Sequence, residues 1–357
     1  MRTLIIAEAG VNHDGSIDDA LALVDVAADA GADVVKFQTF DLEAVATADA
    51  PQAAYQRDRA RADSQKEMLR RLHLDRAAHE RIAAHCAARD IEFLSTAFDT
   101  RSLATLCELG IRRVKVPSGE LTNGPLLLDY ARTGLPLIVS TGMATLAEIE
   151  QALAVISHGL LGREDRPSSR GLRDAYTRAL REGVLRDSVT LLHCTSQYPA
   201  QVEDVHLAAM DTLGAAFGLQ VGYSDHTLGL TVPIAAVARG AGVLEKHITL
   251  DPSRPGPDHA ASLPPDELVT MVTAIREVER AIGSSVKHPV AAEADTIEVA
   301  RRSVVAAKAI RAGEELTEEA LTTLRPGTGR SPMDYWSLLG RRARRDYAVG
   351  ELIDQDQ

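Results

Sequence analysis

The stretch VLEKHIT, residues 243–249, combines the apolar residues of a buried β-strand with three consecutive ionisable residues. Side chains alternate between the two faces of a strand, so Glu245 and His247 share one face and Lys246 lies on the other. Burying such groups is unfavourable by several kcal/mol unless a partner or a metal ion compensates. The stretch therefore predicts a buried strand whose ionisable groups are compensated by partners from neighbouring elements.

Seven other short apolar runs resemble this one, and most are followed by a segment with helical periodicity. They are LIIAEAG (4–10), VVKFQTF (34–40), EFLSTAF (92–98), RVKVPSG (113–119), PLIVSTG (136–142), VTLLHCT (189–195) and QVGYSDH (220–226). Strand–helix alternation implies right-handed crossovers and a parallel sheet. Eight such units over about 280 residues match a (β/α)8 TIM barrel in count and length. A doubly wound open sheet is the alternative, because periodicity alone does not establish closure.

Polar residues concentrate toward the C-terminal end of nearly every run. They are Glu8, Lys36, Gln38, Thr96, Lys115, Ser118, Ser140, Thr141, His193, Ser224, His226, Glu245 and His247. Active sites of TIM barrels are built at that end of the strands. A single residue of this kind is usually a satisfied polar group, but so many at one predicted rim indicate an enzyme.

Two histidines stand out among these residues as candidate metal ligands. His226 ends the seventh run, and His247 lies near the end of the eighth. Neighbouring strands are about 4.8 Å apart, so two imidazoles at matching depth can share a metal ion. With Glu245, Asp225 and Asp258 nearby, a mixed nitrogen and oxygen ligand set suits Mn²⁺ better than structural zinc. Two hydrogen-bonded core histidines are the alternative interpretation.

Lysines and hydroxyl groups form a second set of candidates at the same rim. The set comprises Lys36, Lys115, Ser118, Ser140 and Ser224. Two ammonium groups and several hydroxyl donors can hold a phosphate and a carboxylate. A lysine that forms a Schiff base is the alternative chemistry. The sequence lacks Walker and dinucleotide-binding glycine motifs, so we expect neither a nucleotide nor a nicotinamide cofactor.

Composition narrows the classes of partner. The 357-residue chain carries a formal net charge of −12, which argues against general nucleic-acid binding. Its apolar runs are shorter than a membrane span and its first residues lack a signal peptide's cleavage pattern, so we expect no membrane association. Cys86, Cys107 and Cys194 are few and unclustered, which predicts reduced thiols and a cytoplasmic location.

The chain divides into a catalytic barrel over residues 1–283, a polar linker over 284–300 and a small β-rich domain over 301–357. Two connections within the barrel are unusually long. Residues 41–75 follow the second run at the expected active face, which favours a lid. Residues 159–188 lie beyond a helix, toward the opposite face, and are expected to be peripheral.

Taken together, the motifs at these runs resemble those of the N-acetylneuraminate (sialic acid) synthase family. The motifs are AEAGVNHDGS, VVKFQTF, KVPSGELTN, STGM, LLHCTSQYPA, GYSDHTLG, EKHITLD and GPDHAASL. The tail, from RRSVVAAKAI to LRPGTGRSPMDYW, resembles that family's antifreeze-like domain. The resemblance covers nearly the whole chain, with the motifs in the family's order.

The resemblance implies a metal-dependent condensation of phosphoenolpyruvate with the open-chain aldehyde of N-acetylmannosamine. Carbon 3 of phosphoenolpyruvate attacks the aldehyde, water adds at carbon 2, and phosphate leaves by C–O cleavage. The implied cofactor is Mn²⁺ or another divalent cation such as Mg²⁺ or Co²⁺. The implied assembly is a homodimer in which Arg325 of the small domain reaches the partner's sugar site.

The family's site residues map onto this chain position by position. His226 and His247 match the metal ligands. The residues that match those around phosphoenolpyruvate are Lys36, Lys115, Ser118, Ser140 and Ser224. The residues that match positions facing the sugar or the reacting centre are Glu8, Gln38, Glu120, Tyr198 and Asp258. We expect Glu120, Lys115 and Glu245 to act in catalysis, and Thr96 and Ser196 to complete the substrate contacts.

Ser196 stands where the family often has asparagine, a departure that concerns one phosphate contact. The choice of sugar depends on two other features. GPDHAASL resembles the N-acetylneuraminate and legionaminate branches more than the pseudaminate branch, and the long segment 159–188 resembles that of some bacterial N-acetylneuraminate synthases. We therefore expect N-acetylmannosamine, with 2,4-diacetamido-2,4,6-trideoxymannose as the alternative. The rival classes are a metal-dependent barrel hydrolase, which usually has a His-x-His pair at strand one, and a glycan-binding protein without turnover.

Overall fold

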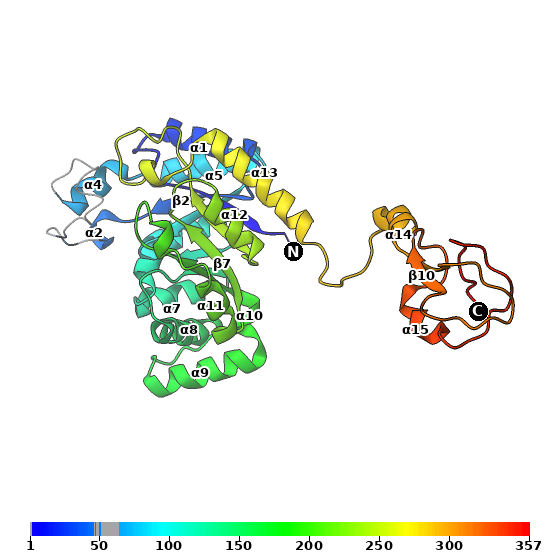
Figure 1. The fold of residues 1–357 in the computed structure, drawn as a ribbon. Coiled ribbons are helices and arrows are strands. Elements are labelled where there is room, and N and C mark those ends of the chain that lie inside the picture. The colour runs from blue at the N-terminus through cyan, green and yellow to red at the C-terminus, as the bar shows by residue number, and fades with distance from the viewer. Residues whose placement is uncertain (1, 46, 48–49, 51–63) are drawn as a thin grey trace. The chain divides into compact units, whose positions relative to one another are not determined.

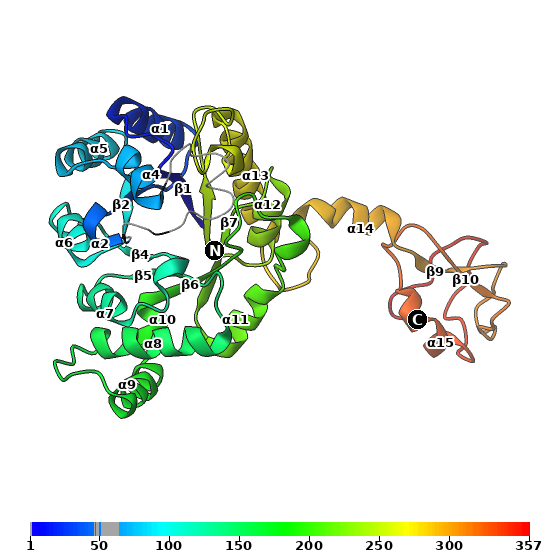
Figure 2. The ribbon, with the colours of Figure 1, turned by 90° about the vertical axis from the view of Figure 1, so that its left-hand side faces the viewer.

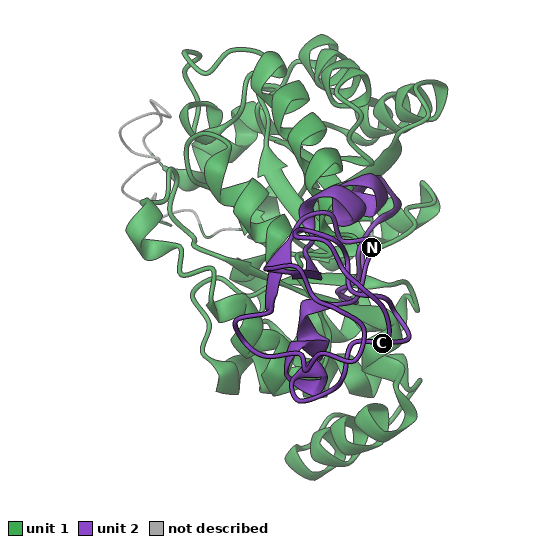
Figure 3. Cartoon of the chain, turned by 45° about the vertical axis from the view of Figure 1, so that its right-hand side comes forward, with its two compact units in different colours: residues 1–283 green, residues 284–357 purple. Residues whose placement is uncertain are grey.

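The computed structural model describes residues 2–45, 47, 50 and 64–357. The chain forms two compact units, residues 1–283 and residues 284–357, which Figure 3 draws in different colours. Each unit has a hydrophobic core of its own. Within these described ranges, no helix is both long enough and apolar enough to cross a bilayer.

Eight parallel strands form a ring in the first unit (Figures 1 and 2). They are β1 (Leu4–Gly10), β2 (Val34–Thr39), β3 (Glu92–Ala97), β4 (Val114–Val116), β5 (Leu137–Ser140), β6 (Val189–Cys194), β7 (Gln220–Asp225) and β8 (Val243–His247). The first strand pairs with β2 on one side and with β8 on the other. β3 contacts β4, and Arg113 donates to both carboxylate oxygens of Glu92 across that junction, at 2.7 and 2.9 Å. The predicted TIM barrel is confirmed. The open sheet is wrong because β1 pairs with β8 and the contact of β3 with β4 closes the ring.

Amphipathic helices cover the outside of the ring, as Figure 2 shows for α1, α5, α6, α7 and α8. The barrel helices are α1 (Ile17–Asp29), α5 (Arg76–Ala88), α6 (Thr100–Glu108), α7 (Gly124–Arg132), α8 (Leu146–Leu160), α11 (Ala209–Phe217), α12 (Thr231–Ala238) and α13 (Pro265–Ile282). Several begin at a side chain that accepts a backbone N–H of the first turn, as Ser16, Asp75 and Asp99 do. Two apolar clusters fill the space between these helices and the strands.

Inside the ring, the alternation of side chains along each strand builds two layers. The lower layer is apolar and contains Ile6, Val34, Leu94, Ile138, Leu192 and Val243. Two residues further along the same strands lie Glu8, Lys36, Thr96, Ser140, Cys194 and Glu245, all of them buried. Gly222 of β7 fits the lower layer because an added Cβ would lie only 2.6 Å from Cδ2 of Leu192. A polar layer therefore lies directly above an apolar layer.

The two long connections contain short helices. Residues 41–75 include α2 (Leu42–Val45) and α4 (Gln65–Leu72), and the predicted lid falls partly on residues 51–63, outside the described residues. Residues 159–188 include α9 (Ser169–Glu182) and α10 (Val184–Ser188). The first of these, α9, packs against α8 (Figure 1), and its small residues Gly171, Ala175 and Ala179 are buried.

The second unit is small and rich in turns. It contains η4 (Ala291–Glu293), α14 (Ala294–Ala300), β9 (Ser303–Ala306), β10 (Leu321–Leu324), η5 (Pro332–Asp334) and α15 (Tyr335–Leu338). β9 and β10 form an antiparallel pair over a core that includes Ile310, Leu316 and Tyr347. The segment 284–300, which the sequence predicts to be a linker, therefore ends in a short helix rather than in an extended tether.

Candidate active site

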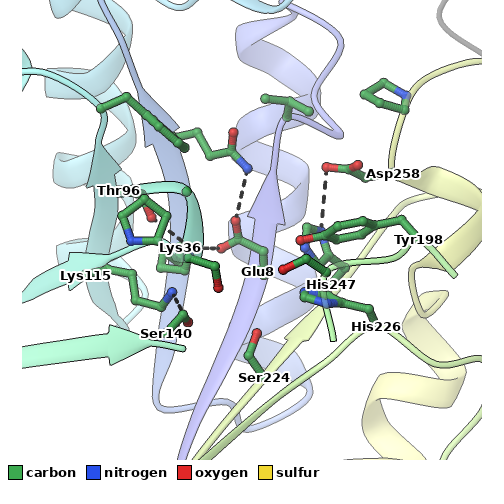
Figure 4. Close-up of a pocket in the computed structure, with 18 of the residues that line it drawn as sticks. Glu8, Lys36, Thr96, Lys115, Ser140, Tyr198, Ser224, His226, His247 and Asp258 are labelled. Atoms are coloured by element: carbon green, nitrogen blue, oxygen red, sulfur yellow. Dashed lines mark hydrogen bonds and ion pairs between the residues drawn. The ribbon is translucent and has the colours of Figure 1, made fainter. Parts of the chain in front are cut away.

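A cavity of about 650 Å³ opens at the C-terminal ends of the barrel strands. It brings together nearly all of the predicted site residues, many of which Figure 4 labels. These are Glu8, Lys36, Gln38, Thr96, Lys115, Ser118, Ser140, Ser196, Tyr198, Ser224, His226, Glu245, His247 and Asp258. Two predicted residues lie elsewhere. Arg325 belongs to the second unit, and Glu120 ends η1 (Ser118–Glu120), where its Oε2 accepts from Nδ2 of Asn123 at 2.7 Å.

The floor of the cavity consists of two carboxylates and two ammonium groups. Lys36 Nζ lies 2.6 Å from Glu8 Oε2 and 3.6 Å from Glu245 Oε2. The other carboxylate oxygen of Glu245 lies 3.4 Å from Lys115 Nζ and accepts from the Ser224 hydroxyl at 2.8 Å. Glu245 therefore joins both lysines. In Figure 4, Glu8 lies between the two lysines and the two histidines.

Hydroxyl groups complete the surroundings of the lysines. Lys36 Nζ donates to Thr96 Oγ1 at 3.0 Å, and Lys115 Nζ donates to Ser140 Oγ at 2.8 Å. Each ammonium group thus has both a carboxylate and a hydroxyl as partners. Such charged groups with several donors can bind an anion with more than one oxygen.

Burial and the neighbouring charges set the ionisation of this floor. Burial raises the pKa of Glu8 to about 7, with Lys36 opposing the rise. Burial also acts to raise the pKa of Glu245, but Lys115 and Lys36 outweigh it and lower that pKa to about 2. Burial lowers the pKa of Lys115, with Glu245 opposing the fall. Glu245 is therefore the more acidic of the two floor carboxyls.

A small cradle adjoins Lys115. The backbone N–H of Gly142 donates to Ser118 Oγ at 3.0 Å, and Cys194 Sγ lies 3.2 Å from the same oxygen. An added Cβ at Gly142 would lie 2.3 Å from Ser196 Oγ and 2.9 Å from Ser118 Oγ, so a larger residue there would displace these hydroxyls. Ser196, which departs from the family's usual asparagine, thus lies next to Ser118.

The two histidines lie side by side at the other side of the cavity. Their ring centroids are 5.5 Å apart, and the Tyr198 ring lies 4.1 Å from His226 and 5.7 Å from His247. His226 Nδ1 must donate to the Thr195 carbonyl oxygen at 2.7 Å, which leaves its Nε2 as the unprotonated nitrogen when the ring is neutral. Burial lowers the pKa of both imidazoles, and for His247 the neighbouring His226 adds to the effect.

This pair fits a divalent cation as a partial ligand set. His247 Nδ1 is buried without a hydrogen-bond partner and lies 3.9 Å from Asp258 Oδ2. A backbone carbonyl that orients the other nitrogen of a ligating histidine, as at His226, is typical of metal sites. In the described part of the chain, no three His, Cys, Asp or Glu side chains are grouped to hold an ion, so water and substrate would fill the remaining positions.

Lys246 and Asp225 form a separate buried pair behind this site. Lys246 Nζ lies 2.6 Å from Asp225 Oδ2, and both side chains are fully buried. The ammonium group also donates to the Thr227 carbonyl, and the Thr227 hydroxyl donates to Asp225. Asp225 therefore pairs with Lys246 and does not join the ligand set of the two histidines, in contrast to the expectation from the sequence. Lys246 lies on the face opposite Glu245 and compensates the Asp225 charge there.

We expect Lys246→Met to lower the free energy of unfolding of the barrel by about 3–5 kcal/mol, because Asp225 is left charged, buried and unpaired. Urea denaturation of the full chain measures this loss. Replacing both partners, as Lys246→Met with Asp225→Leu, should recover much of it. The surface pair Arg239–Asp211 provides the control, since Arg239→Met should cost about 1 kcal/mol or less. An equally small loss at Lys246 would contradict the assigned role.

An apolar wall forms the part of the cavity that the sequence analysis missed. Its buried members are Val11, Phe40, Met68 and Leu72, and Val45, Leu69 and Phe98 pack against them. They come from α2, α4 and the segments that follow β1, β2 and β3. The helical periodicity of QKEMLRRL signals a buried face, but only the fold shows that this face borders the cavity. Cys194, also missed, shares a strand face with Leu192 and is reached by period-two alternation.

Comparisons with known proteins place this site in a family. The NeuB family model matches residues 23–287, and the SAF domain model matches residues 301–357. The chain is 44% identical to the N,N'-diacetyllegionaminic acid synthase of Campylobacter jejuni over 99% of both chains. It is 41% identical to the enzyme of that name from Legionella pneumophila, over 99% of this chain and 94% of the relative.

A solved structure gives the same relationship. The N-acetylneuraminic acid synthetase of Leptospira borgpetersenii, crystallised with citrate, superposes with a TM-score of 0.67 at 30% sequence identity. The match covers 84% of this chain and 91% of that one. The family model matches most of the first unit, and the two relatives match almost the whole chain. The chain therefore belongs to the NeuB family.

Proposed function

We propose that this chain condenses phosphoenolpyruvate with an N-acylated mannosamine-type aldehyde to give a nine-carbon sugar acid and phosphate. The observation that carries the proposal is the charged floor, in which Glu245 joins Lys36 and Lys115 beside the two histidines. The floor and its hydroxyls suit a ligand with both a phosphate and a carboxylate. The family's sugar-acid synthases support the same reaction class.

The reaction forms one carbon–carbon bond and one carbon–oxygen bond, and it breaks one carbon–oxygen bond. Carbon 3 of phosphoenolpyruvate attacks the aldehyde carbon, whose oxygen becomes a hydroxyl on taking up a proton. Water adds at carbon 2 and loses a proton, and the bond from carbon 2 to the bridging oxygen then breaks to release phosphate. If the bridging oxygen is labelled with ¹⁸O, the label should appear in inorganic phosphate. Label retained in the sugar acid would indicate P–O cleavage and would contradict the mechanism.

The residues of the chain divide these tasks by position. Lys36 and Lys115, with the hydroxyls of Ser118, Ser140, Ser196 and Ser224, bind and orient phosphoenolpyruvate. His226 and His247 would hold a divalent cation such as Mn²⁺, Mg²⁺ or Co²⁺, which as a Lewis acid would polarise the aldehyde oxygen. Tyr198, Gln38, Glu8 and Asp258 border the space left for the sugar. Glu120 would reach the reacting centre only after leaving Asn123, so its proposed role in proton transfer needs that movement.

For the sugar, we favour 2,4-diacetamido-2,4,6-trideoxymannose over N-acetylmannosamine. The two relatives at 44% and 41% identity carry the legionaminic acid synthase name. The apolar wall supports the same choice, because a methyl at carbon 6 and a second acetamido methyl suit it better than hydroxyls do. An apolar pocket discriminates against an added hydroxyl by only about 10²-fold at most, so N-acetylmannosamine should remain a slow substrate.

The test is a panel of manno-configured sugars with phosphoenolpyruvate and Mn²⁺, read by product mass and phosphate release. N-acetylmannosamine and its 6-deoxy analogue form a matched pair that differs only at carbon 6. We expect the highest kcat/KM with the diacetamido sugar and a preference for the 6-deoxy member of the pair. Phosphate release without any sugar would instead favour a hydrolase.

The pKa of Glu8 predicts a bend in the pH profile. Because this pKa is raised to about 7, Glu8 gains a proton as the pH falls through 7, and its ion pair with Lys36 is lost. We therefore expect kcat/KM to fall about tenfold per pH unit below 7. Glu8→Gln should be slow at every pH and should lack this bend. The same bend in Glu8→Gln would assign the ionisation to another group.

We also propose a homodimer in which Arg325 serves the partner's sugar site. Arg325 follows β10, is exposed, and has no hydrogen bond or ion pair with the residues that the structure describes. We expect Arg325→Ala to lower kcat/KM, with a loss of transition-state stabilisation of roughly 2–4 kcal/mol. Mixing it with Lys115→Ala, under verified subunit exchange, should restore about a quarter of wild-type activity, since random pairing gives mixed dimers one intact site. Mixed dimers no more active than their parents would exclude the trans arrangement.

A further inference from the structure

Three residues in the loop after β1 have no part in the proposed mechanism. Asn12, His13 and Asp14 belong to the motif AEAGVNHDGS, and none of them lines the cavity. Asn12 is 0% exposed and His13 is 1% exposed. We name residues 11–16 the β1 loop and residues 248–263 the β8 loop. The contacts between these two loops indicate what Asn12, His13 and Asp14 do.

Asn12 connects the two ends of the β8 loop. Its Nδ2 donates to the Ile248 carbonyl oxygen and to Ser262 Oγ, both at 2.8 Å. The Ser262 hydroxyl in turn donates to the backbone carbonyl of Asp258 at 2.7 Å. One buried amide thus holds the beginning of the loop, its end and the residue that borders the sugar space.

Asp14 holds the same loop through His259. Both Asp14 carboxylate oxygens lie near His259 Nε2, at 3.0 and 3.2 Å, and His259 Nδ1 lies 2.7 Å from Thr249 Oγ1. His259 begins η3 (His259–Ala261), directly after Asp258, and is fully buried. Asp14 has φ +50°, a left-handed conformation that is unfavourable for a residue other than glycine and that needs support from its surroundings.

The loop backbone packs tightly around this imidazole. An added Cβ at Gly256 would lie 2.6 Å from Cδ2 of His259, so the turn before Asp258 rests directly on the ring. The loop is also joined to the end of β8, because Leu263 N donates to the His247 carbonyl oxygen at 2.9 Å. Asp258 and His247 are therefore fixed through the contacts with the β1 loop.

We infer that Asn12 and the Asp14–His259 pair are positioning residues that hold Asp258, and with it the sugar side of the site, in place. The inference rests on the proposed condensation. The inference predicts different effects on the two substrates, because the residues that would bind phosphoenolpyruvate are held by other contacts. Lys115 donates a hydrogen bond to Ser140, and among the described residues neither side chain forms a hydrogen bond to the β1 loop or the β8 loop. A loosened β8 loop should therefore weaken sugar binding and leave phosphoenolpyruvate binding intact.

The test compares Asp14→Ala, Asp14→Asn and Asn12→Ala in the full chain. Misplacing a substrate-positioning group by about 1 Å reduces rates by about 10²-fold. We expect both alanine variants to raise the KM for the sugar by about 10-fold or more. The KM for phosphoenolpyruvate, and its Kd measured by calorimetry without sugar, should stay within about twofold of the wild-type values. Asp14→Asn keeps an acceptor oxygen for His259 and should give an intermediate sugar KM.

Asp75→Ala provides the matched control. It removes the N-cap of α5, where Asp75 Oδ1 accepts from Ala78 N at 2.8 Å, and it touches neither loop. It should lower Tm but change neither KM. A parallel rise in both KM values, or an unchanged sugar KM in Asp14→Asn and Asn12→Ala, would overturn the inference. Absence of condensation by the wild-type chain would instead refute the proposed function, so the two failures are distinguishable.

Discussion

Treatment with a chelator should abolish condensation, and added Mn²⁺ should restore it. The two imidazoles 5.5 Å apart are buried, and burial favours the neutral form that can bind a cation. A bound cation contributes several kcal/mol by polarising the reacting oxygen, so we expect His226→Ala and His247→Ala each to lower kcat by about 10³-fold or more. Steady-state assays with added Mn²⁺ measure the loss.

Metal binding can be measured without turnover. Calorimetry or electron paramagnetic resonance should show about one Mn²⁺ per wild-type chain and much weaker binding in each variant. His85→Ala is the control, because His85 lies on α5 and pairs with Asp25 away from the cavity. Full activity after exhaustive chelation would remove the cation from the mechanism. Normal Mn²⁺ binding by both variants would place the ion elsewhere.

The fold could be predicted from the sequence because a buried parallel strand leaves a local signature. Each run combines β-branched and aliphatic residues with a polar residue at its C-terminal end, as LIIAEAG does with Glu8. Period-two alternation then determines which side chains share the cavity. Glu245 and His247 point inward, and Lys246 points outward, as the alternation alone predicts.

The contacts that the sequence could not predict join elements far apart in the chain. Proximity in sequence suggested that Asp225 neighbours the histidines, but the fully buried Lys246 attracts its carboxylate to the other face. From the sequence, Met68 and Leu72 of α4 are only the apolar side of a short helix. The structure shows that they line the cavity. Asn12 and Ser262 are 250 residues apart and meet only because β1 pairs with β8.

The second large effect is expected at Glu245, which is the only carboxylate whose two oxygens approach both floor lysines among the described ion pairs. Glu245→Gln leaves Lys36 with Glu8 and leaves Lys115 without a carboxylate in that set. Breaking a buried pair by removing one partner costs about 3–5 kcal/mol, which corresponds to a loss of about 10²–10⁴-fold. We expect this loss in kcat/KM for phosphoenolpyruvate.

The pH dependence distinguishes this explanation from simple misfolding. Burial already lowers the pKa of Lys115, and Glu245 is the first of the charges that oppose the fall. Without Glu245, this pKa falls further, so a larger fraction of Lys115 loses its proton at a given pH, and with it the charge that attracts the anion. Lowering the pH should then return the proton and recover part of the phosphoenolpyruvate affinity, the reverse of the wild-type loss at Glu8.

Ser140→Ala removes only the hydroxyl beside Lys115 and should lack this recovery. If Glu245→Gln binds phosphoenolpyruvate as tightly as the wild-type chain at pH 7, Glu245 does not sustain the lysine charges, and the assignment of the floor is wrong.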